Sequence, residues 1–583
     1  MRLGNLLNLT LRAPFRLLSH SIVSGQKLVR SLVPAGIPRW FAALGLLLGA
    51  SYAFFMGPLR VPDELGHMYR AYLVSEGICT GAPAIGDLVD FRYIERLPWI
   101  QLSRNSTGRD LLNLVDDTHG RPLPVVAWFY AVNLYSCVPY LPAGAGFRLG
   151  RIFTVTPLTL MYLGRLANLI FYLGLALVAM RLLPGFQLLL AVLALMPMAM
   201  QQAGSLSADA VTMAVSFVMT AYVLRLALTG KPAQLQRSDY LLLLAGVVLA
   251  GLCKSNALLV FLLLLIPGAR FPNRRTRWLT ISGYLFLAYT TAAIWQYIDR
   301  PNGEIFTTLK YAGGIHIDEN AAVIFQQPMV FLSAVDRTVV GSMHNFLEEF
   351  VGKLSWLDIR LPAWVPWLYL ALLFLVAGAG RAGPLGPNDR SLSRWQRILL
   401  VGIFLLNVGA THAVFWTVEM PHQALVTDMA AGRGLIPGLQ GRYLIPFALL
   451  PLIAASGVAT RLRGRWIAVP ALTLVVVVNA VALNLVWDRF QAHSSTLPNR
   501  IRMALRLQFA ETPETAALLY EGQLVRRPGP SPEDGKVYLV HQGQKHWVLN
   551  GQWIAAHGYK SPDDINLIPP ADLAPIPEGD PIR

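Results

Sequence analysis

Long apolar segments alternate with short polar segments along most of the chain. The apolar segments are continuous and lack the strict alternation of strands in an outer-membrane barrel, so they predict helices. A helix satisfies its own backbone hydrogen bonds, which a chain surrounded by lipid requires. We therefore expect an all-α polytopic membrane protein with about eleven transmembrane helices, at residues 40–56, 161–182, 188–202, 208–229, 240–252, 257–267, 278–297, 364–380, 398–418, 443–460 and 467–487.

Composition supports the same class of protein. Hydrophobic residues make up 54% of the 583 positions and charged residues only 14%, whereas charged residues make up about a quarter of a soluble domain. The net charge of +16 raises nucleic acid as a partner, but Lys and Arg lie mostly between apolar segments, where they orient helices. The expected partner is therefore a membrane, and no nucleic acid is expected.

The basic clusters predict the orientation of the chain. Placing the N-terminus inside puts every major cluster on the cytoplasmic side, as the positive-inside rule requires. Residues 240–267 must then form two short helices that turn back near Lys254, and the C-terminus lies outside. The predicted inner clusters lie in residues 1–39, 231–237, 274–277, 390–397 and 461–465.

Three domains follow from this topology. Residues 1–39 are a basic cytoplasmic segment, and residues 40–488 are the transmembrane domain, with outer loops at 57–156 and 298–361. Residues 489–583 form an outer tail with a helix-like stretch around 500–520. A β-hairpin that turns at Gln542-Gly543 begins a small α+β module at about 534–580, and a short helix follows it up to Gly558. The tail aromatics Trp547, Trp553 and Tyr559 either stack on sugar rings or build a small core.

The most informative polar segment is 61–70, directly after the first span. If Pro62 begins a helix, Asp63, His67 and Arg70 share one helical face. Asp63 could then take a proton from a hydroxyl, Arg70 could hold a phosphate, and Glu64 could orient either partner or a divalent cation. The alternative is that the two acids simply mark a helix start, where carboxylates face the positive end of the dipole.

Three further polar segments interrupt the apolar pattern. Lys254 and Arg442 are candidate ligands of a phosphate, since an unpaired cation at membrane depth is costly. Alternatively, either side chain could snorkel to the interface. Ser207 is expected to cap the helix that contains Asp209, which could pair with Lys254 or Arg442. The candidate substrate-binding residues are His67, Gln202, Asp209, Asn256, Gln440 and Tyr443.

Cysteine and histidine give weaker signals. Cys79 and Cys137 could form a disulfide in an oxidising compartment, or they could be two small buried residues. His412, Glu419 and His422 have no zinc-signature spacing and are read as ordinary loop and helix-end residues.

The four polar segments together resemble a large bacterial family of multispanning membrane proteins of unknown function, which is grouped with the GT-C glycosyltransferases. The quoted motifs are Pro62-Asp63-Glu64 with His67 and Arg70-Ala71-Tyr72, Ser207-Ala208-Asp209, Lys254, and Gln440-Gly441-Arg442-Tyr443. One departure is that Gly66 and Leu65 stand where many relatives have Pro and Ala. The tail resembles short Lys-His-Trp modules of exported bacterial proteins.

The resemblance implies a GT-C-like fold and a sugar transfer from a polyprenyl-phosphate lipid to an envelope glycan or lipid acceptor. The site would face outward from the bacterial cytoplasmic membrane, with Asp63 or Glu64 as the acidic residue of the first outer loop. The cofactor is left open, with Mg²⁺ or Mn²⁺ as the candidate if Asp63 and Glu64 hold a metal. The alternatives are a transporter or flippase of lipid-linked glycans and a noncatalytic envelope assembly factor.

Overall fold

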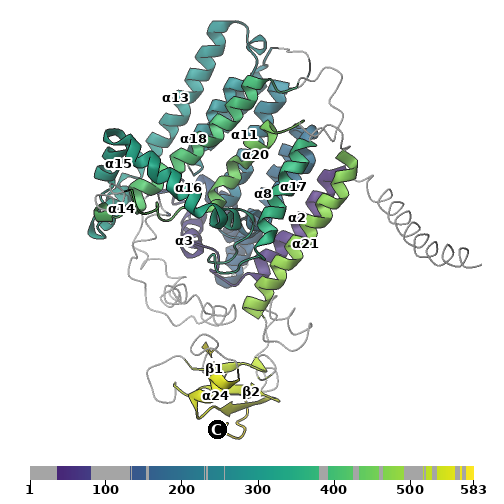
Figure 1. The fold of residues 1–583 in the computed structure, drawn as a ribbon, viewed down its shortest axis with the longest axis vertical. Helices are drawn as coiled ribbons and strands as arrows, with labels where there is room; N and C mark the ends of the chain where they lie inside the picture. The colour runs from purple at the N-terminus through teal and green to yellow at the C-terminus, as the bar shows by residue number, and fades with distance from the viewer. Residues whose placement is uncertain are drawn as a thin grey trace, which may run out of the picture.

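The computed structural model of the 583-residue chain is drawn in Figure 1. The structure describes residues 36–80, 132, 134–152, 157–228, 230, 234–254, 256–379, 391–424, 432–457, 464–491, 517, 520–527, 535–557, 565–567 and 573–582. Most of the predicted N-terminal segment 1–39, most of the outer loop 57–156 and nearly all of the helix-like stretch at 500–520 lie outside the described residues.

Five helices within the described ranges are long and apolar enough to cross a membrane. A sixth span is counted if the bent pair α9–α10 is taken as one crossing. The chain is thus a membrane protein with several apolar helices, while eleven crossings and their orientation remain predictions. The five helices are α2 (Gly36–Phe55), α8 (Pro157–Leu182), α11 (Asp209–Leu228), α18 (Arg394–Glu419) and α21 (Gly464–Gln491).

Two of the predicted spans are broken in ways that matter for the site. The helices α9 (Gln187–Ala194) and α10 (Pro197–Ala203) meet at an angle of 80°, and Pro197 begins the second helix because it cannot donate a backbone hydrogen bond. The helix α12 (Arg237–Leu252) is followed by η6 (Asn256–Leu265), a long 3-10 helix.

The pair α12–η6 turns back on itself, as the sequence predicts for residues 240–267. The N–H of Leu235, just before α12, donates to the carbonyl of Arg270, just after η6, at 2.8 Å. A 3-10 helix rises about 2.0 Å per residue against about 1.5 Å in an α-helix. The ten residues of η6 therefore return over nearly the distance that the sixteen residues of α12 cover.

Helices also fill the segment that the sequence predicts as the second outer loop, residues 298–361. The sequence did not predict these helices, because amphipathic helices with many charges lack the continuous apolar pattern of a span. Figure 1 shows α14 and α15 at one end of α13. Helix α13 (Arg274–Ile298) covers the predicted span 278–297, and the helices of the segment that follows are α14 (Arg300–Ala312), α15 (Ile317–Gln326) and α16 (Pro328–Val351).

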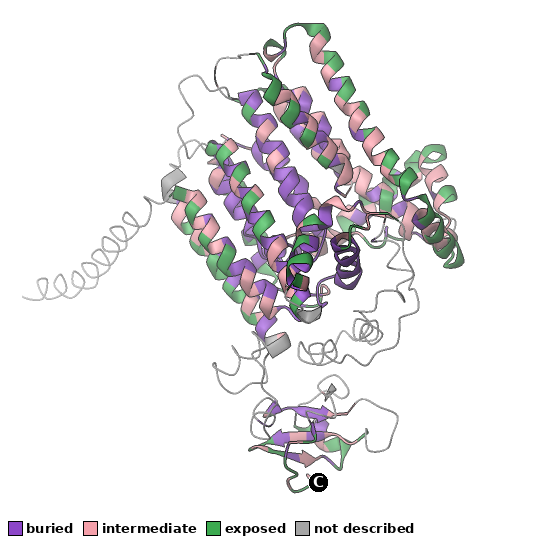
Figure 2. Ribbon diagram, turned by 180° about the vertical axis from the view of Figure 1, so that it is seen from behind, coloured by how far each residue is buried: buried purple, intermediate pink, exposed green. Residues whose placement is uncertain are grey.

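The core lies around α11, which is the most buried of the five spanning helices (Figure 2). The outward faces of other helices carry exposed apolar side chains such as Leu47, Phe286 and Leu405, a surface suited to lipid.

The remaining helices are α3 (Glu64–Ser75), η4 (Val138–Tyr140), α7 (Leu141–Ile152), η5 (Pro184–Phe186), η7 (Gly268–Arg270), α17 (Trp364–Gly378), α19 (His422–Ala424), η9 (Gly441–Leu444) and α20 (Ile445–Ala454).

The tail contains a four-stranded sheet in the order β3-β2-β1-β4. Its strands are β1 (Leu524–Arg526), β2 (Tyr538–His541), β3 (Gln544–Trp547) and β4 (Ile565–Leu567), and α24 (Gly551–Ala556) follows the hairpin. The predicted hairpin and the short helix after it are confirmed, whereas β1 and β4 are not foreseen.

Local chemistry explains the hairpin turn. Gln542 and Gly543 both have positive φ, at 52° and 78°, as a two-residue turn of type I′ requires. Glu521 accepts hydrogen bonds from both of their N–H groups. Trp547 is partly buried against the small core of the tail, and Trp553 stacks on His557, while Tyr559 lies outside the described residues.

Candidate functional site

The backbone at the start of α3 sets the direction of the Asp63 side chain. Asp63 is the residue before the helix and has a left-handed conformation, with φ at 62°, which Asp tolerates better than most residues. Its carboxylate makes no capping hydrogen bond, so it does not serve the helix start in that way. The side chain is 53% exposed, and its Oδ2 lies 3.6 Å from Nη2 of Arg442.

Glu64, the next residue, points the other way into the protein. Its two oxygens accept from Nε and Nη2 of Arg165 at 2.8 and 2.6 Å, and both side chains are completely buried. The N–H of Leu206 donates to the same carboxylate at 3.2 Å. Glu64 thus lies in a buried ion pair, away from Asp63. The two carboxylates therefore have different partners, Arg442 for Asp63 and Arg165 for Glu64, and do not share a site for the divalent cation that the sequence left open.

Arg165 was missed by the sequence analysis. It also donates to the backbone carbonyls of Ala53, Met56 and Gly57, so it joins α8 to the end of α2 and the start of α3. The available signal was a charged residue in the middle of an apolar run, which needs an internal partner.

Lys254, Asp209 and Arg442 come together from three separate elements. Nζ of Lys254, in the turn between α12 and η6, lies 2.8 Å from Oδ1 of Asp209 at the start of α11. Nη1 of Arg442, in η9, lies 3.7 Å from Oδ2 of the same carboxylate. The side chain of Arg442 is only 1% exposed, so the snorkelling alternative does not describe it.

Neighbouring groups hold these charges in place. Lys254 lies over the rings of Tyr135 and Tyr443, at 5.1 Å from each ring centre. Arg442 donates to Oε1 of Gln202 at 3.3 Å. Ser207 accepts from the N–H of Asp209 and caps the start of α11, as the sequence predicts. Among the described residues, neither Nε of Arg442 nor Oε1 of Gln440 has a hydrogen-bond partner.

His67 faces the same charged group from α3, which is not one of the spanning helices. Its Nδ1 lies 2.8 Å from the hydroxyl of Tyr140. Burial, followed by the positive charges of Lys254 and Arg442, lowers the pKa of His67 to about 3, although Asp209 opposes the shift. The imidazole is therefore neutral at physiological pH.

Arg70 does not reach this group, although it was expected to share a face with Asp63 and His67. It donates to the carbonyls of Cys79 and Tyr135, at 2.6 and 3.0 Å, and its guanidinium lies 5.9 Å from the centre of the Trp295 ring. Cys79 is bonded to Cys137, as the sequence allows. Arg70 and the disulfide together fix the segment that carries Tyr135.

A cavity of about 680 Å³ joins the predicted residues. Lys310 and Glu419 also line it, paired at 2.9 Å, and the sequence analysis missed both roles because their partners are 109 positions apart. The predicted residues that line the cavity are Asp63, His67, Asp209, Lys254, Gln440, Arg442 and Tyr443. Glu64, Arg70 and Gln202 are not among the lining residues, and the side chain of Asn256 lies outside the described part of the chain.

The rest of the wall is largely apolar. Its apolar lining includes Phe306 and Leu309 of α14 and Val414, Phe415 and Val418 of α18. The cavity therefore offers buried cations and a half-exposed carboxylate next to an apolar wall. This combination suits a ligand with an anionic head group and an apolar chain.

Comparison with known proteins identifies the family. Residues 46–451 match the family described as "Predicted membrane protein (DUF2142)", and the tail lies outside this match. Searches of the curated proteins and of the solved structures gave no match. Since the matched region covers most of the chain and contains every lining residue of the cavity, the chain belongs to the DUF2142 family of membrane proteins.

Proposed function

We propose that the protein is a membrane glycosyltransferase that moves a sugar from a polyprenyl-phosphate donor to an envelope glycan or lipid acceptor. The reaction would take place at the outer face of the bacterial cytoplasmic membrane. The observation that supports this function best is the cavity itself, in which Lys254 and Arg442 lie beside the half-exposed carboxylate of Asp63 and next to an apolar wall.

The two cations are suited to hold the donor phosphate. A lysine ammonium has three N–H donors, and one of those of Lys254 is used by Asp209. Arg442 retains its Nε–H without a partner in the described structure. Negative charge grows on the phosphate as it leaves the sugar, and donors that are already in position stabilise that charge without reorganisation.

Asp63 is the proposed general base. It takes the proton of the acceptor hydroxyl while the acceptor oxygen forms a bond to the anomeric carbon of the sugar. The bond between that carbon and the phosphate oxygen breaks, and polyprenyl phosphate leaves with the electron pair. Neutral His67 and the amide of Gln440 would bind sugar hydroxyls, since both line the cavity.

A transporter of lipid-linked glycans is the second candidate. The sharp break between α9 and α10 and the returning pair α12–η6 favour it, because discontinuous helices form many transport sites. The two functions differ in their product, since a transporter moves the lipid and leaves its sugar bond intact.

Transfer by the purified full-length protein tests the proposal. A panel of polyprenyl-phosphate donors with radiolabelled sugars is incubated with the protein in vesicles, together with an envelope extract as acceptor. We expect labelled product from the wild type and a loss of about 100-fold or more for Asp63→Asn, the usual worth of a general base. Binding of polyprenyl phosphate by native mass spectrometry should survive in Asp63→Asn and weaken in Lys254→Ala.

Glu304→Gln is the matched control. Glu304 is an exposed acid on α14 that pairs with Arg300 and does not line the cavity, so its loss should leave transfer unchanged. Full transfer by Asp63→Asn would remove Asp63 from the mechanism. Movement of intact donor across the vesicle membrane without any labelled product would instead establish the transporter.

A further inference from the structure

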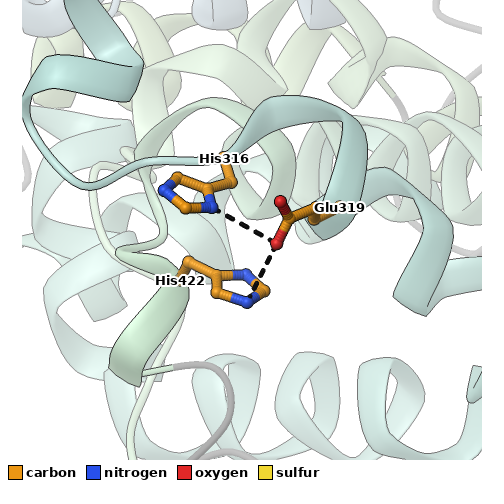
Figure 3. A group of neighbouring side chains, drawn as sticks. All are labelled: His316, Glu319 and His422. Atoms are coloured by element: carbon orange, nitrogen blue, oxygen red, sulfur yellow. Dashed lines mark ion pairs between the residues drawn. The ribbon is translucent and has the colours of Figure 1, made fainter.

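Two histidines and a glutamate, none of which lines the cavity, lie close together at α15 and α19 (Figure 3). His316 precedes α15, Glu319 lies in its first turn, and His422 lies in α19, just after α18. Nδ1 of His316 and Nε2 of His422 lie 3.2 and 3.1 Å from the same oxygen of Glu319, Oε2. The two imidazole rings are stacked, with an angle of 8° between their planes.

His422 has a second polar neighbour, Asn320. The amide nitrogen of Asn320 lies 2.8 Å from the carbonyl oxygen of Met420, so it must be the donor there. The amide oxygen of Asn320 then lies 3.3 Å from Nδ1 of His422 and accepts a hydrogen bond from its N–H. In a neutral imidazole this leaves a lone pair on Nε2, pointing at the carboxylate of Glu319.

A cation between Nε2 and this oxygen, either a proton or a metal ion, makes the contact attractive. Nδ1 of His316 is buried and has no hydrogen-bond partner in the described structure, although Oε2 of Glu319 lies 3.2 Å away. Ligands about 2.0 to 2.2 Å from a tetrahedral zinc ion lie roughly 3.3 to 3.5 Å from one another. The two contacts to Glu319 are close to this separation, and all three ligand atoms lie within 4.8 Å of one another.

We propose that His316, Glu319 and His422 bind a divalent transition metal of the zinc class. Imidazole and carboxylate ligands suit Zn²⁺, whereas Mg²⁺ and Ca²⁺ prefer oxygen alone. The three side chains are 29 to 54% exposed, so water completes the fourth position. Asn320 is the outer partner that orients His422, as hydrogen bonds commonly do for metal-bound histidines.

The metal fastens the start of α15 to the end of α18. Lys310 and Glu419 connect the same part of the chain at the wall of the cavity. The ring of Tyr311, at the end of α14, stacks on His316 at 4.9 Å and extends the cluster toward that wall. The ion is therefore a structural clamp that holds α14 and α15 against α18.

Metal content and stability of the full-length protein in detergent test the site. The protein carries a tag without histidine, and the probes are Zn²⁺ and, for its absorption spectrum, Co²⁺. We expect one Zn²⁺ per chain by elemental analysis, a spectrum typical of a site with four or five ligands for Co²⁺, and a higher melting temperature with Zn²⁺ than after chelation. Mg²⁺ should produce none of these effects.

The variants Glu319→Gln and His422→Gln should lose the bound metal and the stabilisation by Zn²⁺. His344→Gln is the matched control, because His344 also contacts a glutamate, Glu348, at 3.3 Å but has no second histidine there. It should bind Zn²⁺ as the wild type does. If a variant fails to fold, the wild type alone still tests the site. Its melting temperature should fall when a chelator removes Zn²⁺ and recover when Zn²⁺ is added back. A wild type without stoichiometric Zn²⁺, or equal metal content in His422→Gln, would overturn the proposal.

Discussion

Asp63 and Glu64 are neighbours in the chain, yet their carboxylates lie in opposite environments. The left-handed backbone of Asp63 directs its side chain to the cavity, while Glu64 enters the helix and meets Arg165 in the interior. The change in backbone conformation between these two residues therefore directs one carboxylate to the cavity and the other to the buried ion pair. The strained residue is held by its surroundings, as is common at functional sites.

The Glu64–Arg165 pair should matter for stability. Removing one partner of a buried ion pair leaves an uncompensated charge and costs about 3 to 5 kcal/mol. We expect Glu64→Gln to unfold at a clearly lower temperature in detergent than the wild type. Glu304→Gln, which disrupts an exposed pair, should melt as the wild type does. Equal melting of Glu64→Gln and the wild type would show that Arg165 finds other compensation.

At the scale of elements, η9 shows how a short helix carries a site residue. Gly441 precedes Arg442, and its N–H donates to Oε2 of Glu349 on α16 at 2.9 Å. A Cβ at Gly441 would overlap the carbonyl oxygen of Phe346, also on α16. The absence of a side chain lets η9 pack against α16 and places Arg442 at the cavity.

Gly441→Ala should therefore displace η9 and, with it, the Arg442 side chain, although Gly441 itself does not line the cavity. Overpacking of this kind costs about 1 to 3 kcal/mol. We expect a lower melting temperature and weaker binding of polyprenyl phosphate, measured by native mass spectrometry. Gly409→Ala in α18 is the control, because nothing lies within 4 Å of the added Cβ, and it should lower neither the melting temperature nor the binding. Normal binding in Gly441→Ala would show that η9 can shift without moving Arg442.

The elements also show where sequence patterns are sufficient. The break near Lys254 was predicted because a single crossing at 240–267 would place the cluster at 274–277 on the wrong side. The 3-10 conformation of η6 was not predicted, since such a long 3-10 helix is rare and depends on the space left by the neighbouring helices. The helices α14, α15 and α16 escaped prediction because their charges interrupt the apolar pattern.

At the scale of the whole molecule, the orientation in the membrane is the main expectation still to be measured. The positive-inside rule places the N-terminus in the cytoplasm and the C-terminus outside. Fusions of alkaline phosphatase and of a fluorescent protein to the C-terminus should give phosphatase activity and no fluorescence. Cys79 and Cys137 should likewise be found oxidised in cells, as a disulfide on the outer side requires. A fluorescent C-terminal fusion would reverse the topology and the proposed outer site.

The sequence by itself determined the class of the protein, its apolar helices, the returning pair at Lys254 and the hairpin of the tail. These features depend on local composition, because a helix in lipid or a tight turn satisfies its own backbone. Only the tertiary structure decided that Asp63 faces Arg442, that Glu64 pairs with Arg165, and that His316 meets His422. The choice of partner for a charge depends on backbone direction and on packing between distant elements, which no local pattern records.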